Sequence, residues 1–299
     1  TYEDSDLIVF NKPPGLAVHG GSATDFGLIE ALRGARPGQP DLELVHRLDR
    51  DTSGCLLVAK RRAALRDLHL QLREGQTEKR YLALVCGKWN LGTKRIELAL
   101  DTDERRSGER HVAVRAHGKK SVSTFKPVQF FGNLATLMEV EIDTGKTHQI
   151  RVHAAHAGHP VAGDDKYGNR IFNGIFKDYG LKRMFLHSSS LGFTRPGTRE
   201  PMLASAPLPP ELSAVLDTLT RGKARAPQDE RGKTLKPEGA RGPIVAPRVQ
   251  RPAPVVQAGK PRMGNPRTGG AKPGKPGLVK GSGPVRGEGR RRARTTGGR

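Results

Sequence analysis

Apolar and polar residues alternate, or recur at helical spacing, through most of the first 220 residues. The clearest strand is 134–143, where Met138, Val140 and Ile142 would face one side and the residues between them the other. Shorter apolar or alternating runs predict further strands. These lie at 6–12, 55–59, 78–89, 94–100, 111–117, 123–131, 184–194 and 201–207.

Helical spacing of apolar residues predicts four helices with local start and stop signals. Asp25 and Thr147 are candidate N-caps of two of them, and Gly34 is a candidate stop. The four ranges are 25–34, 61–75, 147–158 and 209–220. Many antiparallel strands with interspersed helices predict an α+β fold, a mixed, mostly antiparallel sheet with flanking helices.

The composition changes sharply after residue 220. Residues 221–299 hold 21 Lys and Arg against four acidic residues, with 16 Gly, 11 Pro and no aromatic residue. That segment carries +17 of the chain's formal +22, and it cannot bury enough apolar surface to offset the entropy of ordering it. We therefore predict a folded domain at 1–220 and a disordered basic tail at 221–299. Clustered arginines such as those in "GRRRAR" favour a nucleic acid partner, although a solubilising tail without a specific partner would have the same composition.

Two cysteines and the absence of long apolar runs suggest where in the cell the protein works. Cys55 and Cys86 lie in strand-like apolar runs, where a reduced buried thiol is expected, and no disulfide framework is apparent. No run is long enough to span a membrane. We expect a cytoplasmic monomer without a membrane partner. The chain starts inside a strand-like pattern, so we also expect that an N-terminal part is missing from it.

The segment "LVHRLDRDTSG" crowds two arginines and two aspartates against the apolar run "CLLVA". Asp51 has a structural explanation, because "DTSG" is a good turn sequence. Asp49 has no such local explanation. It could form ordinary surface pairs with Arg47 and Arg50, or it could be a reactive carboxylate that nearby cations keep ionised.

The segment "TGKTHQIRVH" offers the best distant cation. If it forms a helix, Arg151 groups with Thr147 and Ile150, and the helix start could receive a phosphate. Lys146 and His148 are then candidates for binding substrate. A partly exposed basic helix with no function would have the same pattern.

The remaining candidates are individually weak. The histidines from His148 to His159 match no common zinc spacing and have no cysteine nearby, so we predict no metal site. Tyr81 suits a strand core, and it could also stack on a base. Leu186 would ordinarily be a strand residue.

The order of five segments is more specific than any one of them. "NKPPGLAVH", "HRLDRDTSG", "KRYLALV", "TGKTHQIRVH" and "MFLHSSSLGF" together resemble the RluA family of pseudouridine synthases over roughly residues 1–215. The resemblance implies an RNA-binding cleft and a uridine-to-pseudouridine isomerase that needs no metal, cofactor or bound nucleotide. It also implies that a small S4-like domain would precede this chain.

The resemblance assigns roles residue by residue. The family's catalytic aspartate falls on Asp49, its active-site tyrosine on Tyr81, and the arginine that pairs with the aspartate on Arg151. Arg47 matches the arginine that takes part in extruding the target nucleotide, and Leu186 matches an apolar residue of the uracil pocket. The expected substrate is 23S rRNA of the large ribosomal subunit, modified at several sites after base flipping.

Two other functions remain open from the sequence. A non-catalytic RNA-binding or ribosome-assembly factor could have the same fold, although Asp49, Tyr81 and Arg151 together argue against it. A hydrolase using the paired aspartates would need a water-activating partner, which the histidine spacing does not supply.

Overall fold

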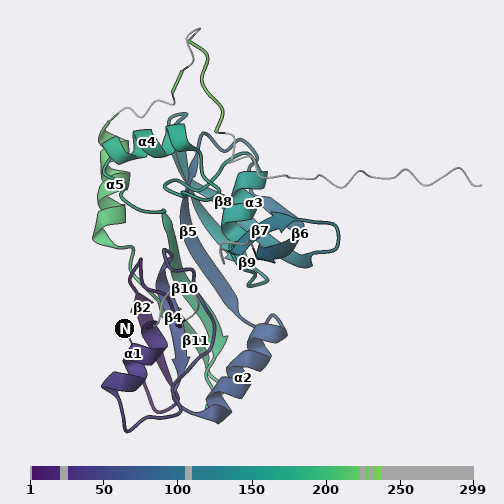
Figure 1. The fold of residues 1–299 in the computed structure, drawn as a ribbon, viewed down its shortest axis with the longest axis vertical. Coiled ribbons are helices and arrows are strands. Elements are labelled where there is room, and N and C mark those ends of the chain that lie inside the picture. Colours follow the sequence, from purple (N-terminus) through teal and green to yellow (C-terminus); the bar gives the residue numbers. More distant parts are fainter. Residues whose placement is uncertain (1, 21–25, 105–109, 223–226, 229–231, 238–299) are drawn as a thin grey trace, which may run out of the picture. The chain divides into compact units, whose positions relative to one another are not determined.

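The computed structural model describes residues 2–20, 26–104, 110–222, 227–228 and 232–237, and the side chains of 103, 104 and 110 are left out. Its centre is one sheet in the strand order β1-β2-β4-β10-β5-β9-β8-β6-β7, with β3 paired to β4 and β11 paired to β10. Only the β4–β10 pair is parallel among the described strands. The predicted mixed, mostly antiparallel sheet is therefore confirmed (Figure 1).

Eleven strands and five helices make up the described fold. The strands are β1 Tyr2–Glu3, β2 Leu7–Lys12, β3 Glu43–Leu44, β4 Ser53–Ala59, β5 Glu78–Cys86, β6 Lys94–Glu104, β7 Arg110–Val114, β8 Lys119–Phe131, β9 Ala135–Ile142, β10 Leu186–Thr194 and β11 Pro201–Ser205. The helices are α1 Leu28–Ala35, α2 Arg62–Arg73, α3 Gln149–His156, α4 Arg170–Asp178 and α5 Pro210–Arg221.

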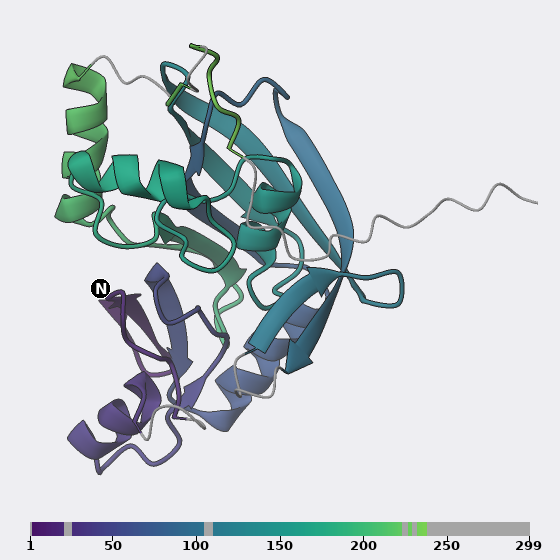
Figure 2. The same ribbon diagram turned by 45° about the horizontal axis from the view of Figure 1, so that its top comes forward.

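Alternation along the central strands divides the core between the two faces of the sheet. On β5, Tyr81, Ala83 and Val85 join the core that contains apolar residues of α1 and α3. Leu84 and Cys86 join a second core that contains apolar residues of α4 and α5, and those two helices lie side by side in both views (Figures 1 and 2). The period of two in the sequence thus produces two separately packed faces.

Two local predictions about helix ends were wrong, and one helix was missed. Gly34 lies inside α1, which ends only at Ala35. The N-cap of α3 is His148 instead of Thr147. Helix α4 was not predicted, although Asn169 caps it by accepting hydrogen bonds from the N–H groups of Ile171 and Phe172. The proposed cap Asp25 lies outside the described residues.

The predicted tail lies mostly outside the described residues as well. Within the described part, Pro237 is buried and packs against Gly87. Both cysteines are free and buried. No described helix is long and apolar enough to cross a membrane.

The parallel β4–β10 pair brings two distant segments together. His187 pairs with Ser53 and Ser188 with Gly54. Parallel strands start at the same edge of a sheet, so the loop before β4 meets the first residue of β10. Gly54 makes this approach possible, because it has a φ of +114° and a Cβ there would overlap the Ser188 carbonyl.

We expect Gly54→Ala to lower the free energy of unfolding by about 3 kcal/mol or more, because both the backbone angle and the strand contact are lost. Gly75→Ala is the matched control. Gly75 also has a positive φ, of +70°, but nothing lies within 4 Å of the added Cβ. It should cost only about 1 kcal/mol. Urea unfolding of both variants measures the difference, and equal losses would contradict the role given to the Ser188 contact.

Candidate active site

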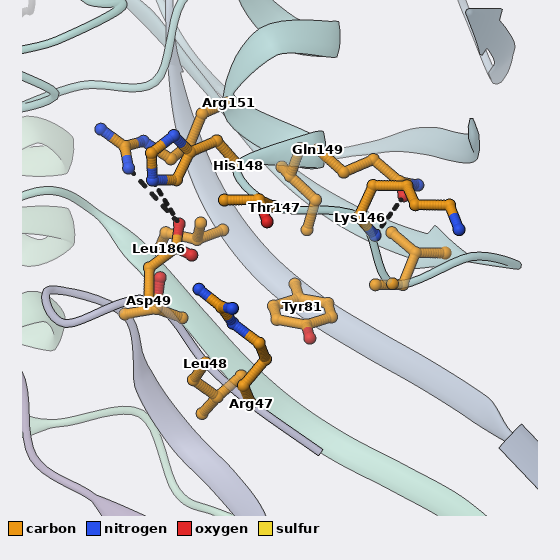
Figure 3. A pocket seen from close by; sticks show the side chains of 14 residues that line it. Arg47, Leu48, Asp49, Tyr81, Lys146, Thr147, His148, Gln149, Arg151 and Leu186 are labelled. Atoms are coloured by element: carbon orange, nitrogen blue, oxygen red, sulfur yellow. Dashed lines mark hydrogen bonds and ion pairs between the residues drawn. The ribbon is translucent and has the colours of Figure 1, made fainter. Parts of the chain in front are cut away.

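One pocket on the α1 and α3 side of the sheet contains all seven residues that the sequence singled out for the site. Asp49 comes from the β3–β4 loop, Tyr81 from β5 and Leu186 from the start of β10. The pocket has a cavity volume of about 70 Å³, enough for a few water molecules. Its lining residues are Arg47, Leu48, Asp49, Thr52, Tyr81, Ile142, Gly145, Lys146, Thr147, His148, Gln149, Ile150, Arg151 and Leu186 (Figure 3).

A buried lysine fixes the loop that carries Asp49. Lys12 is fully buried, and its Nζ donates to the carbonyls of Pro13, Leu16 and Arg50 at 2.8–2.9 Å. Burial lowers the pKa of Lys12 to about 8, although Asp51 and Asp49 oppose that shift. The three hydrogen bonds of Lys12 link the loop beside Asp49 to the "NKPPG" segment.

Arg151 and His148 approach the same oxygen of Asp49. Arg151 Nη1 lies 3.4 Å from Asp49 Oδ2, and His148 Nε2 lies 3.9 Å from it (Figure 3). The Asp49 side chain keeps 18% of its surface exposed, and Arg151 keeps 12%. The cation therefore holds one carboxylate oxygen, while Asp49 Oδ1 makes no hydrogen bond to a described residue.

Arg151 is itself held by a second carboxylate that sequence reasoning missed. Its Nε and Nη2 donate to the two oxygens of Asp164 at 2.7 and 2.9 Å, and Asp164 is buried. Asp164 Oδ1 also accepts the backbone N–H groups of Lys166 and Tyr167. Burial lowers the pKa of Arg151, but the hydrogen bonds and charge of Asp164 outweigh it, and the net shift is upward. This bidentate pair fixes the plane of the guanidinium.

Tyr167 completes the support of the site. Its ring centroid lies 5.0 Å from the Arg151 guanidinium carbon, and its hydroxyl lies 2.9 Å from both the Val112 nitrogen and His148 Nδ1. Because the Val112 N–H donates to the hydroxyl oxygen, the hydroxyl hydrogen is free to donate to His148 Nδ1. The remaining ring hydrogen of a neutral His148 then sits on Nε2, facing Asp49.

The backbone at His148 is unusual. His148 has φ 53° and ψ 19°, a left-handed conformation that costs a non-glycine residue about 1–2 kcal/mol. Buried Gln149 stabilises the turn, because its Oε1 accepts from Thr144 Oγ1 and the Lys146 N–H, while its Nε2 donates to β8. The turn thus starts α3 in a geometry that aims His148 at Asp49.

The other sequence candidates differ in how they enter the pocket. The Arg47 guanidinium projects toward the space between Asp49 and Tyr81, whereas the Lys146 side chain extends away from Asp49 (Figure 3). Tyr81 is buried, and burial raises its pKa above the ordinary value, with a smaller lowering effect from Ser188. Its hydroxyl is therefore protonated at neutral pH.

Asp164 and Tyr167 could not have been found from spacing. They lie 13 and 16 residues after Arg151 in the loop "GDDKYG", which no motif connects to the helix. An apolar stretch that ends in two aspartates and a tyrosine was the only signal. Among the described residues, no group of three or more His, Cys, Asp or Glu side chains is placed to hold a metal ion.

Comparison with known proteins identifies the family of this chain. Residues 6–156 match the family model described as RNA pseudouridylate synthase, a range that includes Asp49, Tyr81 and Arg151. The chain belongs to this family. The isomerase interpretation is therefore confirmed over the hydrolase and non-catalytic alternatives.

Relatives and solved structures agree with that assignment. Proteins named ribosomal large subunit pseudouridine synthase C from Pasteurella multocida and Escherichia coli are 51% and 50% identical, over 75% and 74% of this chain and 68% and 70% of theirs. The structure of human RNA pseudouridylate synthase domain containing 1 has a TM-score of 0.57 at 26% identity, covering 74% of this chain and 92% of that one. The domain containing 4 protein has a TM-score of 0.59 at 23% identity, covering 73% and 92%, which supports the fold.

We expect Asp164→Asn to reduce the free energy of unfolding by about 3 kcal/mol at pH 7, because a buried guanidinium loses its paired charge. The pKa of Asp164 is lowered: burial raises it, but Arg151 outweighs burial. The stabilisation is thus present above the unfolded-state pKa of about 3.9 and is lost as the pH falls through the lower folded-state value. Urea titrations at pH 7 and below pH 4 should show the variant converging on wild type in acid. Asp165→Asn, an exposed neighbour with the same charge change, should match wild type throughout.

The lowered pKa of His148 predicts a second dependence of folding stability on pH. Burial is the main cause that lowers its pKa to about 4, so between about pH 6.5 and 4 the unfolded chain binds a proton that the folded chain does not. Stability should fall as the pH falls through this window. His148→Asn keeps a residue that tolerates the left-handed backbone and should reduce the loss between pH 7 and 5. Part of the slope should remain, because burial also lowers the pKa of His46 and His153 to about 4. If stability of the variant changed with pH as steeply as that of wild type, His148 would not contribute to the pH dependence.

Proposed function

We propose that this pseudouridine synthase acts on the RNA of the large ribosomal subunit, at several uridines of 23S rRNA, with Asp49 as the reactive carboxylate. The observation that carries the proposal is the Asp49–Arg151–Asp164 arrangement, in which one oxygen of Asp49 faces a fixed cation and the other has no described partner. The names of relatives at about 50% identity support the choice of RNA. The expected cytoplasmic location and monomeric state stay predictions.

The reaction is an isomerisation with no net loss of atoms. The C1′–N1 bond of a uridine breaks, the uracil turns, and C1′ joins C5; the C5 hydrogen leaves as a proton and N1 gains one. Asp49 could begin this by attacking the sugar, attacking the ring or removing a sugar proton. Each route requires an anionic, aimed carboxylate, which the positive charge of Arg151 supports.

The cavity beside Asp49 is small, about 70 Å³, so a base could approach the carboxylate only after its nucleotide has left the stack. Arg47 is exposed and its guanidinium projects toward the space between Asp49 and Tyr81 (Figure 3), where it could fill the vacated stack or hold a phosphate. Tyr81 and Leu186 supply an aromatic and an aliphatic surface for the uracil. Because Tyr81 keeps its proton, we assign it stacking and hydrogen-bond donation in place of general base catalysis.

Lys146 and His148 would contact substrate at the start of α3. Lys146 is exposed and its side chain points away from Asp49, which suits a phosphate outside the pocket. A neutral His148 with hydrogen on Nε2 would add a second donor beside Asp49 Oδ2. These assignments make Arg151 and His148 partners of the carboxylate and Lys146 a partner of the RNA backbone.

The test is pseudouridine formation in unmodified large-subunit RNA, mapped by chemical labelling, for wild type, Asp49→Asn and Asp51→Asn. Asp51 is the matched control, an exposed carboxylate in the same turn with no described hydrogen bond. We expect Asp49→Asn to lose about 10³-fold or more in rate while still binding RNA, and Asp51→Asn to remain active.

The outcomes separate the parts of this proposal. Equal activity of Asp49→Asn and wild type would refute the assignment of Asp49. Wild-type activity on transfer RNA but none on ribosomal RNA would refute the substrate and leave the site assignment intact.

A further inference from the structure

A second hollow adjoins the active-site pocket and is lined by cationic side chains. It has a cavity volume of about 460 Å³ and shares Arg47, Tyr81, Ile142 and Gly145 with the pocket. The full lining is His46, Arg47, His69, Leu72, Arg73, Lys79, Tyr81, Ile142 and Gly145, with no acidic residue among them. We call this hollow the Lys79 groove.

Lys79 is the least expected member of the groove. It is only 7% exposed, yet its Nζ makes no hydrogen bond or ion pair with any described residue. Burial lowers its pKa, opposed by the charge of Asp143. Asp143 is itself paired with Arg95 at 2.9 Å. Lys79 Nζ is not among the fully buried side-chain atoms that lack a partner, so the ammonium reaches the groove from a largely buried stem and is available to an anionic ligand.

The two arginines of the groove also lack a paired carboxylate. Arg47 and Arg73 are exposed, and neither pairs with a described carboxylate. Other arginines of the domain do pair, such as Arg36 with Glu3 and Arg199 with Asp67. By contrast, His46 is committed to structure, because its Nε2 accepts the Leu57 N–H and burial lowers its pKa to about 4.

The distance between Lys79 and Tyr81 indicates the size of a ligand that could contact both residues. The two residues lie on the same face of β5, two positions apart, so their Cα atoms are separated by about 6.6 Å along the strand. That distance is comparable to one nucleotide of an unstacked chain. A nucleic acid strand whose base occupies the pocket would therefore bring a neighbouring phosphate near Lys79.

We propose that the Lys79 groove binds the RNA backbone next to the flipped uridine, with Lys79 contacting one phosphodiester and Arg73 of α2 extending the contact along the strand. This inference rests on the proposed RNA modification and adds a substrate subsite to it. Phosphate contacts position the strand without reading its sequence. Lys79 and Arg73 are thus positioning residues, and their loss should weaken binding more than chemistry.

The experiment compares Lys79→Met, Arg73→Gln and the control Arg66→Gln in the full chain. Arg66 lies on α2, is exposed, forms no ion pair with a described residue and does not line the groove. Lys79→Met nearly keeps the length of a largely buried side chain and removes a charge that has no bonded counter-charge among the described residues, so the fold should not be weakened. We expect Lys79→Met and Arg73→Gln to raise KM and the RNA Kd about tenfold with kcat nearly unchanged, and Arg66→Gln to match wild type.

Two further readouts identify the ligand as phosphate. The dependence of log Kd on log salt should become shallower by roughly 0.7 for each lost single-strand contact. A methylphosphonate placed at each phosphate flanking the target uridine should weaken wild-type binding at one position, and Lys79→Met should lose nothing more on that RNA. Such non-additivity requires the two groups to interact.

Wild-type KM and salt slope in Lys79→Met would overturn the proposal, as would equal sensitivity of both proteins to methylphosphonate at every position. The RNA Kd can be measured in the Asp49→Asn background, where the reaction should be slowed about 10³-fold or more. A failure of the groove is therefore distinguishable from a failure of the proposed reaction.

Discussion

The site depends on one largely buried guanidinium. Arg151 holds Asp49 at 3.4 Å on one side and Asp164 in a bidentate pair on the other, with the Tyr167 ring 5.0 Å from its carbon. Two carboxylates against one cation leave a net negative charge, and the tighter pairing belongs to the buried Asp164. The positive charge of Arg151 therefore faces Asp49, while its shorter hydrogen bonds go to Asp164. An exposed pair of the same type would hold neither carboxylate in a fixed position.

Contacts from neighbouring elements fix the position of the Asp49 carboxylate relative to Arg151. Lys12 fixes the loop that carries Asp49, Gln149 fixes the turn before α3, and the left-handed His148 aims its ring at the same carboxylate oxygen. Strained backbone is tolerated where surrounding contacts over-determine it, and here Gln149 makes four hydrogen bonds around the strained residue. The energetic cost is local, and the result is a carboxylate with one committed oxygen and one available oxygen.

The sequence alone predicted most of the strands and the set of residues that meet in the pocket, for different reasons. Alternation in 134–143 is strong because β9 has a different core on each face. The grouping of Asp49, Tyr81, Arg151 and Leu186 came from family resemblance, since no local rule connects positions in four separate elements. Asp164 and Lys79 were missed because a pairing across a loop and a buried lysine on an apolar strand have no periodic signal. The cap of α3 was mispredicted since Thr147 is the better cap by residue type, whereas the hydrogen bonds of Gln149 decided the geometry.

The strand order also constrains how the protein can be made. β10 lies between β4 and β5 and supplies Leu186 to the pocket, yet it is among the last strands in the chain. During synthesis from the N-terminus, about a hundred residues must be added after β5 before β10, the strand that pairs with both β4 and β5, is made. Until then each presents an unpaired apolar edge, the type of surface on which nascent chains aggregate. The pocket that contains Asp49 therefore cannot form on a growing chain before its tenth strand has joined the sheet.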